Sequence, residues 1–303
     1  EIDLMKKIDI VAQKLASTEK KEITFCPICG SEQTTKFLNS DRYNLPVSFR
    51  ACQDCELVYM SPLPKNEFFS WFYDGMYRSI LEELFNKSFD NNALLPGQIS
   101  YASELYTFLK PHLNLKDSRQ KLKVLDIGGS TGVVPIELNR LLKDSEIDLE
   151  IVVQDPSAKE LEYSSENGCK VECGLFEDIS FKNYGKFDII LLCQTIDHIY
   201  SLEKTLNKIK SLMHDETFFF VDYVDFKFNC VKKGYKNSVK IDHIFNFSWK
   251  NFNLLLKKHH LHTIDTCVSA DHHLRGFLLK YPQSSFKKNY SGQVDYSGWL
   301  TSK

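Results

Sequence analysis

The sequence has no apolar stretch that approaches the roughly 18 to 20 residues of a membrane-spanning helix. Its most apolar run, Thr217 to Val221, is flanked by charged residues. Neither sign of charge is in excess, because 38 basic side chains oppose 40 acidic ones among 303 residues. These features exclude a membrane-spanning protein and a disordered chain, and they predict a globular protein with one large domain or two modest ones.

The N-terminal segment also lacks the apolar centre of a secretory signal peptide, because Asp3, Lys6, Lys7 and Asp9 interrupt it. The nine cysteines are odd in number and unevenly placed, which disfavours a secreted disulfide scaffold. We therefore expect a protein of the reducing cytoplasm, with no membrane partner.

Four cysteines form two Cys-x-x-Cys pairs, Cys26 with Cys29 and Cys52 with Cys55, and 22 residues separate the pairs. This spacing is typical of two facing knuckles that supply four thiolates to a tetrahedral zinc ion. Gly30 supports this interpretation because each knuckle needs a tight turn. A closed shell of four thiolates leaves no position for water, so the sequence predicts a structural zinc ion.

A redox dithiol and an RNA-binding ribbon are the alternatives for the cysteine pairs. Between the pairs, the basic residues Lys36, Arg42 and Arg50 are opposed by Glu32 and Asp41, which gives little support for nucleic acid. The other cysteines are expected to pack as small buried hydrophobic residues. They are Cys169, Cys173, Cys193, Cys230 and Cys267.

The pattern of apolar residues divides the chain into three predicted parts. Residues 1–62 hold an N-terminal helix and the zinc-binding module, and residues 63–115 form a helical cap or linker. From 116 to 303, short apolar runs alternate with helical patterns, which is typical of an α/β sheet with helices on both faces. The expected strands are Lys123–Ile127, Glu150–Gln154, Lys170–Cys173, Phe187–Cys193, Thr217–Val221, His262–Val268 and Gly276–Tyr281, the last two as an antiparallel pair.

A glycine-rich turn follows the first of these strands and precedes a helix. Its glycines, Gly128, Gly129 and Gly132, would let a ligand approach the backbone at a helix N-terminus. Asp126 lies two residues before the first glycine, and no Lys-Ser/Thr follows as it would in a P-loop. This order resembles the acid-x-Gly-x-Gly-x-Gly motif of class I S-adenosylmethionine (SAM)-dependent methyltransferases, with Ser130 at the middle glycine. The resemblance implies a Rossmann-like fold and SAM as cofactor, held by Asp126 and the three glycines.

Further landmarks of that family follow in the same order. Asp155 stands where the family places the acid that holds both ribose hydroxyls, although a helix cap before Ser157 is an alternative role. Leu175 and Phe176 resemble the segment that frames the adenine, and Gln194 follows the fourth strand. The loop from Thr195 to His198 would then lie beneath the reacting methyl group.

A four-cysteine module before such a domain resembles a bacterial family that includes the sugar C-methyltransferases of deoxysugar and polysaccharide biosynthesis. The resemblance covers roughly residues 23–279. It includes a Phe-Tyr…Tyr pattern, here Phe72-Tyr73…Tyr77, which implies Tyr77 as a cofactor contact, and an acid–histidine pair, here Asp242-His243. In C-methylating members a tyrosine lies close before this pair. Here Lys240 is nearer than Tyr235, so the atom that receives the methyl group stays open.

Methyl transfer from a sulfonium requires an aligned nucleophile and removal of its proton, and imidazole titrates near working pH. His243, oriented by Asp242, is the first candidate for the general base, and His198 is the second. The other clustered histidines have no carboxylate–histidine spacing that would complete a second metal site. They are His259, His260, His262, His272 and His273.

We therefore expect SAM-dependent methyl transfer to a small, sugar-derived acceptor such as a nucleotide-linked sugar or glycan precursor. The first alternative is an RNA methyltransferase, which the near-neutral charge disfavours. The second is a non-catalytic methyltransferase-like binding module, which Ser130 at a glycine position would favour. The sequence does not define the acceptor or the oligomeric state.

Overall fold

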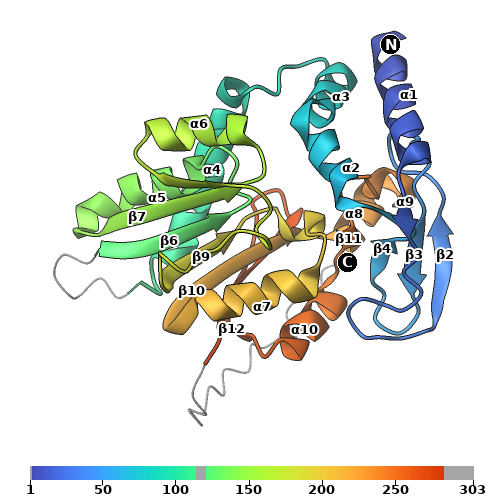
Figure 1. Cartoon of the computed structure of the whole chain (residues 1–303). Coiled ribbons are helices and arrows are strands. Elements are labelled where there is room, and N and C mark those ends of the chain that lie inside the picture. Colours follow the sequence, from blue (N-terminus) through green and yellow to red (C-terminus); the bar gives the residue numbers. More distant parts are fainter. Residues whose placement is uncertain (1, 114–120, 283–303) are drawn as a thin grey trace.

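The computed structural model describes residues 2–113 and 121–282 and contains a seven-stranded sheet (Figure 1). The strand order is β12-β13-β10-β9-β6-β7-β8, in which β6 to β10 run parallel and β13 pairs antiparallel with both β10 and β12. The bounds are β6 Lys121–Ile127, β7 Asp148–Asp155, β8 Lys170–Cys173, β9 Phe187–Leu192, β10 Met213–Val224, β12 His262–Val268 and β13 Leu274–Lys280. The predicted strands and the final antiparallel pair are confirmed.

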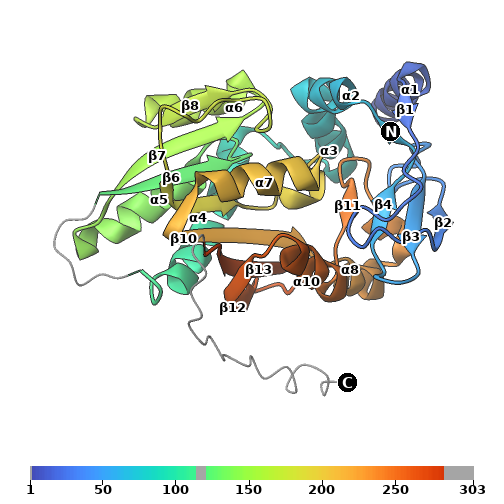
Figure 2. The same ribbon diagram turned by 60° about the horizontal axis from the view of Figure 1, so that its bottom comes forward.

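Helices cover both faces of this sheet, as predicted, and make two hydrophobic cores. One face packs against α4 (Asn91–Leu109), α5 (Val133–Leu142) and α6 (Ala158–Glu166). The other packs against α7 (Leu202–Leu212) and α10 (Trp249–Lys258), which Figure 2 shows on the same side of the sheet. Because both faces are covered, the central strand β9 is apolar at every position except Asp188.

The N-terminal module lies beside the sheet, on the right in Figure 1. Its own four-stranded sheet has the order β11-β4-β3-β2, with β2 Thr34–Leu38, β3 Phe49–Cys52, β4 Val58–Met60 and β11 Phe245–Asn246. A further pair joins β1 (Lys20–Lys21) to β5 (Leu63–Pro64). Since β11 comes from the far end of the sequence, the module is completed by the methyltransferase-like part of the chain.

A helical segment connects the module to the sheet. It consists of α2 (Asn66–Trp71), the π-helical turn η1 (Phe72–Met76) and α3 (Tyr77–Phe85). The helix α1 (Ile2–Ser17) begins the described chain, before the strands of the module. Gly75, at φ 141°, produces a kink within η1. The short elements η2 (Lys143–Ser145), η3 (Ile196–His198), α8 (Phe226–Lys233) and α9 (Tyr235–Ser238) complete the described chain.

The three predicted parts share their cores. One core runs from Val11 and Phe49 near the N-terminus to Phe277 in the seven-stranded sheet, and α4 supplies Leu105 and Leu109 to the other core. The proposed division at residue 115 lies outside the described residues. The three-part division stays a prediction, and its parts depend on one another for burial of apolar surface.

The expectation that the other cysteines are buried is wrong for Cys173, which is exposed. Cys169, Cys193, Cys230 and Cys267 are partly buried and pack against the hydrophobic cores. Cys173 ends β8, an edge strand of the seven-stranded sheet, so no described strand pairs with its outer side. None of the described helices combines the length and the apolar character needed to cross a membrane.

Candidate active site

The turn between β6 and α5 needs its three glycines for steric reasons. Gly128 and Gly132 have φ values of 65° and 67°, a region that disfavours other residues. A Cβ atom on Gly128 would come within 2.6 Å of Thr195, and one on Gly129 or Gly132 would clash with Asp126 or Ser164. Glycine at these positions therefore lets the turn pack closely against Thr195, Asp126 and Ser164.

Ser130 completes the same turn in a left-handed conformation, with φ 50°. Its hydroxyl donates to Glu160 Oε2 at 2.7 Å, and Glu160 also forms a 2.5 Å ion pair with Arg78 of α3. Arg78 in turn donates to Asn91 at 2.8 Å. The serine at the glycine position therefore connects the turn to α3 and α4.

Asp155 lies at the end of β7, beside this turn. Its Oδ2 accepts the Ser130 N–H and its Oδ1 accepts the Ser157 N–H, both at 2.9 Å. Ser157 is itself the N-cap of α6, so the helix does not need Asp155 as its cap. Each carboxylate oxygen keeps a second lone pair and can accept a further hydrogen bond.

Two buried carboxyl groups meet at this edge of the sheet. Burial, opposed by the N–H groups of Ser157 and Ser130, raises the pKa of Asp155 to about 6. Burial and the nearby charge of Asp155 raise the pKa of Asp126 to about 7. The carboxyl groups of Asp155 and Asp126 at this edge of the sheet therefore lose their protons near neutral pH.

The other expected cofactor residues lie around the same edge, with one difference in orientation. Gln194 is exposed after β9, with φ 49°, and Leu175 is half-buried. Phe176 is buried and its ring packs against Phe181, so it faces the core. Tyr77 packs against the ring of Tyr73, and burial together with the Asp242 carboxylate raises its pKa.

His198, Asp242 and His243 come together, although 44 residues separate His198 from Asp242. The side chain of Thr195 borders Gly128. One 3-10 turn, η3, leads from Thr195 to His198. This turn places the cluster next to the glycine turn. The side chain of His198 is 23% exposed, whereas those of His243 and Asp242 are 3% and 0% exposed.

The surroundings of His198 fix its tautomer. Its Nδ1 lies 2.7 Å from the backbone oxygen of Asp242 and 2.9 Å from the hydroxyl of Tyr73. A carbonyl oxygen can only accept, so Nδ1 carries the proton and Nε2 keeps a free lone pair. Burial lowers the pKa of His198, which keeps the ring neutral near pH 7.

The Asp242 carboxylate has no hydrogen-bond partner among the described residues, although it is fully buried. Its Oδ2 lies 3.3 Å from Lys240 Nζ, 3.8 Å from His198 Nδ1 and 3.9 Å from His243 Nε2. Burial raises the pKa of Asp242, but Lys240 and His198 outweigh it and the net pKa is lowered. Burial and Lys240 lower the pKa of His243 well below its usual value.

The distances in this cluster would also permit a metal ion. However, the Lys240 ammonium already supplies a positive charge 3.3 Å from the carboxylate, and a cation there would be repelled. The cluster therefore fits proton transfer better than metal binding.

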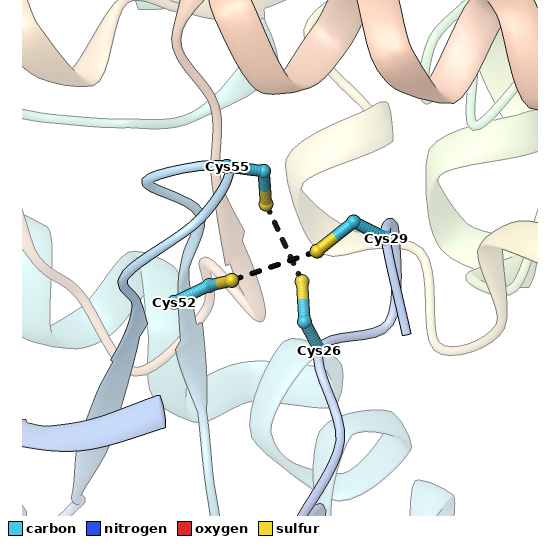
Figure 3. Close-up of side chains that lie close together, drawn as sticks. All are labelled: Cys26, Cys29, Cys52 and Cys55. Carbon is cyan, nitrogen blue, oxygen red and sulfur yellow. Dashed lines mark hydrogen bonds between the residues drawn. The ribbon is translucent and has the colours of Figure 1, made fainter. Parts of the chain in front are cut away.

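The four cysteines of the module converge on one point (Figure 3). The Sγ atoms of Cys26 and Cys55 are 3.4 Å apart, and those of Cys29 and Cys52 are 3.6 Å apart. A regular tetrahedron with Zn–S bonds of about 2.3 Å has S–S edges of about 3.8 Å. The sulfur atoms therefore fit a tetrahedral metal ion.

The two knuckles have the same backbone pattern. Cys26 O accepts the Gly30 N–H at 2.9 Å, and Cys52 O accepts the Glu56 N–H at 3.0 Å. Gly30 and Glu56 are both left-handed, with φ values of 75° and 64°. The chain thus builds two similar turns around the sulfur atoms.

Residues 118–268 match a family model described as a methyltransferase domain. Magnesium protoporphyrin IX methyltransferase from Synechocystis PCC 6803 with bound SAH (S-adenosylhomocysteine) is similar in structure, with a TM-score of 0.52 and 11% identity over 72% of this chain and 100% of that one. The plantazolicin methyltransferase BpumL in complex with SAH has a TM-score of 0.52 and 14% identity over 70% and 93% of the two chains.

The CMeT domain of the citrinin polyketide synthase has a TM-score of 0.50 and 13% identity over 61% of this chain and 53% of that one, so this chain spans about half its length. No curated protein sequence matches the chain. The fold is that of the class I methyltransferases. Residues 118–268 thus form a methyltransferase domain, and two of the structures that share its fold contain bound SAH.

Sequence reasoning did not assign Gln154, Arg78, Glu160, Tyr73 or Lys240 to the site. Gln154 accepts the Gly128 N–H and donates to the Gly174 carbonyl, so it links two loops of the candidate cofactor site. Lys240 offered a local signal, since it lies two residues before the acid–histidine pair. Tyr73 belongs to the Phe-Tyr…Tyr pattern, but its contact with His198 spans 125 positions.

The glycine turn makes a testable prediction about stability. Gly132→Ala should lower the free energy of unfolding more than Gly185→Ala, because Gly185 has φ 72° but open space around it. We expect about 1 kcal/mol for Gly185→Ala from backbone strain, and at least about 2 kcal/mol for Gly132→Ala from strain plus the clash with Ser164. Urea denaturation measures both, and equal losses would contradict the steric role of Gly132.

Proposed function

We propose that the protein transfers the methyl group of SAM to a small, sugar-derived acceptor, such as a nucleotide-linked sugar or glycan precursor. The observation that carries the proposal is the buried cluster of His198, Asp242 and His243 beside the glycine turn. Tyr73, Tyr77 and Lys240 surround the cluster with hydroxyl and ammonium groups suited to a polyhydroxylated molecule. The net charge of −2 argues against an RNA acceptor.

The cofactor site is proposed to lie at the carboxyl edge of β6, β7 and β9. Asp126 and the turn residues Gly128, Gly129 and Gly132 would border the methionine part, and the free lone pairs of Asp155 would accept the ribose hydroxyls. Leu175, Gln194 and Tyr77 complete the proposed contacts, whereas Phe176, expected from the sequence to join them, faces the core. When bound, SAM supplies an electrophilic methyl group.

For the general base, the geometry favours His198 over His243, which ranked first by sequence. His198 is the more exposed of the two, and its Nε2 has a free lone pair. Once His198 has taken a proton from an acceptor hydroxyl, the Asp242 carboxylate 3.8 Å from Nδ1 would stabilise the imidazolium. His243 would then act through its contact with the His198 ring, at a centroid distance of 4.7 Å.

We also propose that Cys26, Cys29, Cys52 and Cys55 bind a structural zinc ion. All four cysteines are free of disulfides, and their spacing supports a closed tetrahedral shell. Such a shell has no position open for chemistry. The ion would hold together a module whose strands are only two to five residues long.

The geometry weakens the alternative that the domain is a non-catalytic binding module. Ser130, the sequence feature in its favour, adopts the left-handed conformation that the turn needs and bonds to Glu160. The Asp242 carboxylate is buried without a hydrogen bond from the described residues and is paired only with Lys240, which would be a costly arrangement to retain without a chemical role.

The role of Asp155 predicts how cofactor affinity depends on pH. Ribose hydroxyls donate to the ionised carboxylate, and the pKa of Asp155 is raised to about 6, so SAH affinity should weaken up to roughly tenfold per pH unit below that value. Asp155→Asn should bind SAH about 10- to 100-fold more weakly at neutral pH and lose most of this dependence. Calorimetric titration with SAH measures both. If the affinity of the wild-type protein for SAH did not change between about pH 5 and pH 8, the assignment would be contradicted.

The base assignment predicts a separation of catalysis from cofactor binding. With an acceptor found by screening nucleotide sugars with methyl-labelled SAM, His198→Gln should lower kcat by about 10²- to 10⁴-fold and leave SAH affinity unchanged. His214→Gln is a matched control, since His214 pairs with Asp188 away from the cluster. A larger loss in His243→Gln than in His198→Gln would transfer the role to His243.

The zinc proposal predicts one zinc ion per chain by elemental analysis. Cys52→Ser should remove the ion and lower the melting temperature by at least about 5 °C, because loss of a metal site costs several kcal/mol. Cys173→Ser, outside the module, should change neither quantity. Purified protein that contains no zinc and keeps its stability with chelator would refute the proposal.

A further inference from the structure

We propose that Asp41 is a positioning residue for the acid–histidine pair, because it fixes the loop of residues 239–246 on the four-cysteine module. Asp41 lies between the two cysteine pairs and Asp242-His243 lies in the loop. The inference rests on the proposed function, since it assigns the module a part in orienting the groups that would move the proton.

The carboxylate of Asp41 is fully buried and uses both of its oxygens. Oδ1 accepts the N–H groups of Tyr43 at 2.9 Å and Leu45 at 3.0 Å, which folds the residues after Asp41 into a tight turn. Oδ2 accepts the N–H of Ile241 at 2.9 Å, across 200 positions of sequence. One side chain thus joins a turn of the module to the residue directly before Asp242.

Backbone bonds hold the same loop on the module at further points. The Arg42 N–H donates to Val239 O at 3.1 Å, and the Met60 N–H donates to Ile244 O at 2.9 Å. Beyond Ile244, β11 pairs with β4, which begins three residues after Cys55. The module therefore holds the chain on both sides of the acid–histidine pair.

Between these ties, the loop turns back on itself. The His243 N–H donates to Lys240 O at 3.0 Å, so Lys240 and Asp242 lie close enough for their ion pair. The backbone oxygen of Asp242 in this turn accepts the Nδ1–H of His198. The position of the loop therefore determines which nitrogen of His198 carries the proton.

The test compares the tautomer of His198 in the full chain with and without the Asp41 tie. Asp41→Asn can keep the two bonds to Tyr43 and Leu45 through its oxygen, but it presents an NH₂ group to the N–H of Ile241. Released from the Asp242 carbonyl, His198 should shift from the Nδ1–H tautomer towards the Nε2–H tautomer that free histidine prefers. Nitrogen NMR of ¹⁵N-histidine-labelled protein reports this shift, with the His198 signal assigned from His198→Gln.

Lys236→Ala is the matched control. Lys236 donates to Asn44 at 2.5 Å, so it also ties α9 to the same turn of the module, but it is exposed and its side-chain hydrogen bond goes to Asn44 rather than to the 239–246 loop. We expect wild type and Lys236→Ala to show the Nδ1–H tautomer and Asp41→Asn to show a mixture richer in Nε2–H. SAH affinity and zinc content should be equal in all three.

An unchanged His198 tautomer in folded Asp41→Asn protein would overturn the proposal. If that variant does not fold, Asp41→Glu replaces it, because it keeps the charge and displaces the oxygens by one methylene, and an unchanged tautomer overturns the proposal there too. The measurement needs no acceptor. A protein that methylates no sugar can still show the shift, and an active methyltransferase can lack it, so the two proposals fail separately.

Discussion

The buried carboxylate of Asp242 is the constraint on which the arrangement of the site depends. A charge removed from water is costly unless opposite charge or hydrogen bonds compensate it. Here the compensation comes from the Lys240 ammonium 3.3 Å away, and the rings of His198 and His243 also lie within 4 Å of the carboxylate. These groups reach Asp242 only if η3 and the 239–246 loop are both in place, so the site and the fold around it form together.

The same constraint explains why the N-terminal module and the methyltransferase sheet are not independent. A two-residue strand such as β11 cannot be stable alone, and it needs β4 as a partner. In return, β4 gains a second neighbour and its residues become fully buried. The apolar core that runs from Val11 through Phe49 to Phe277 makes this dependence energetic as well as geometric.

Most of the fold could be predicted because its elements are encoded locally. The central parallel strands contain short apolar runs, as in Phe187–Leu192, and the crossover helix Leu202–Leu212 has a clear amphipathic period. β11 could not be predicted, since two residues carry no period. α4 lies within the predicted helical segment, although local propensity disfavours Pro96 and Gly97 inside a helix.

The candidate site also has one part that the local sequence predicts and another part that it does not predict. The proposed cofactor side depends on backbone conformations that only particular residues allow, so glycines at fixed spacing from Asp126 were sufficient to predict it. The acceptor side depends on side chains that meet across 125 to 200 positions, such as Tyr73 with His198 and Asp41 with Ile241, and no local pattern encodes those meetings. In the proposed function, Asp41 and Tyr73 act on the acceptor side from the module turn and from η1, outside the glycine turn. Substitutions there would therefore change the proposed acceptor side without strain in the glycine turn.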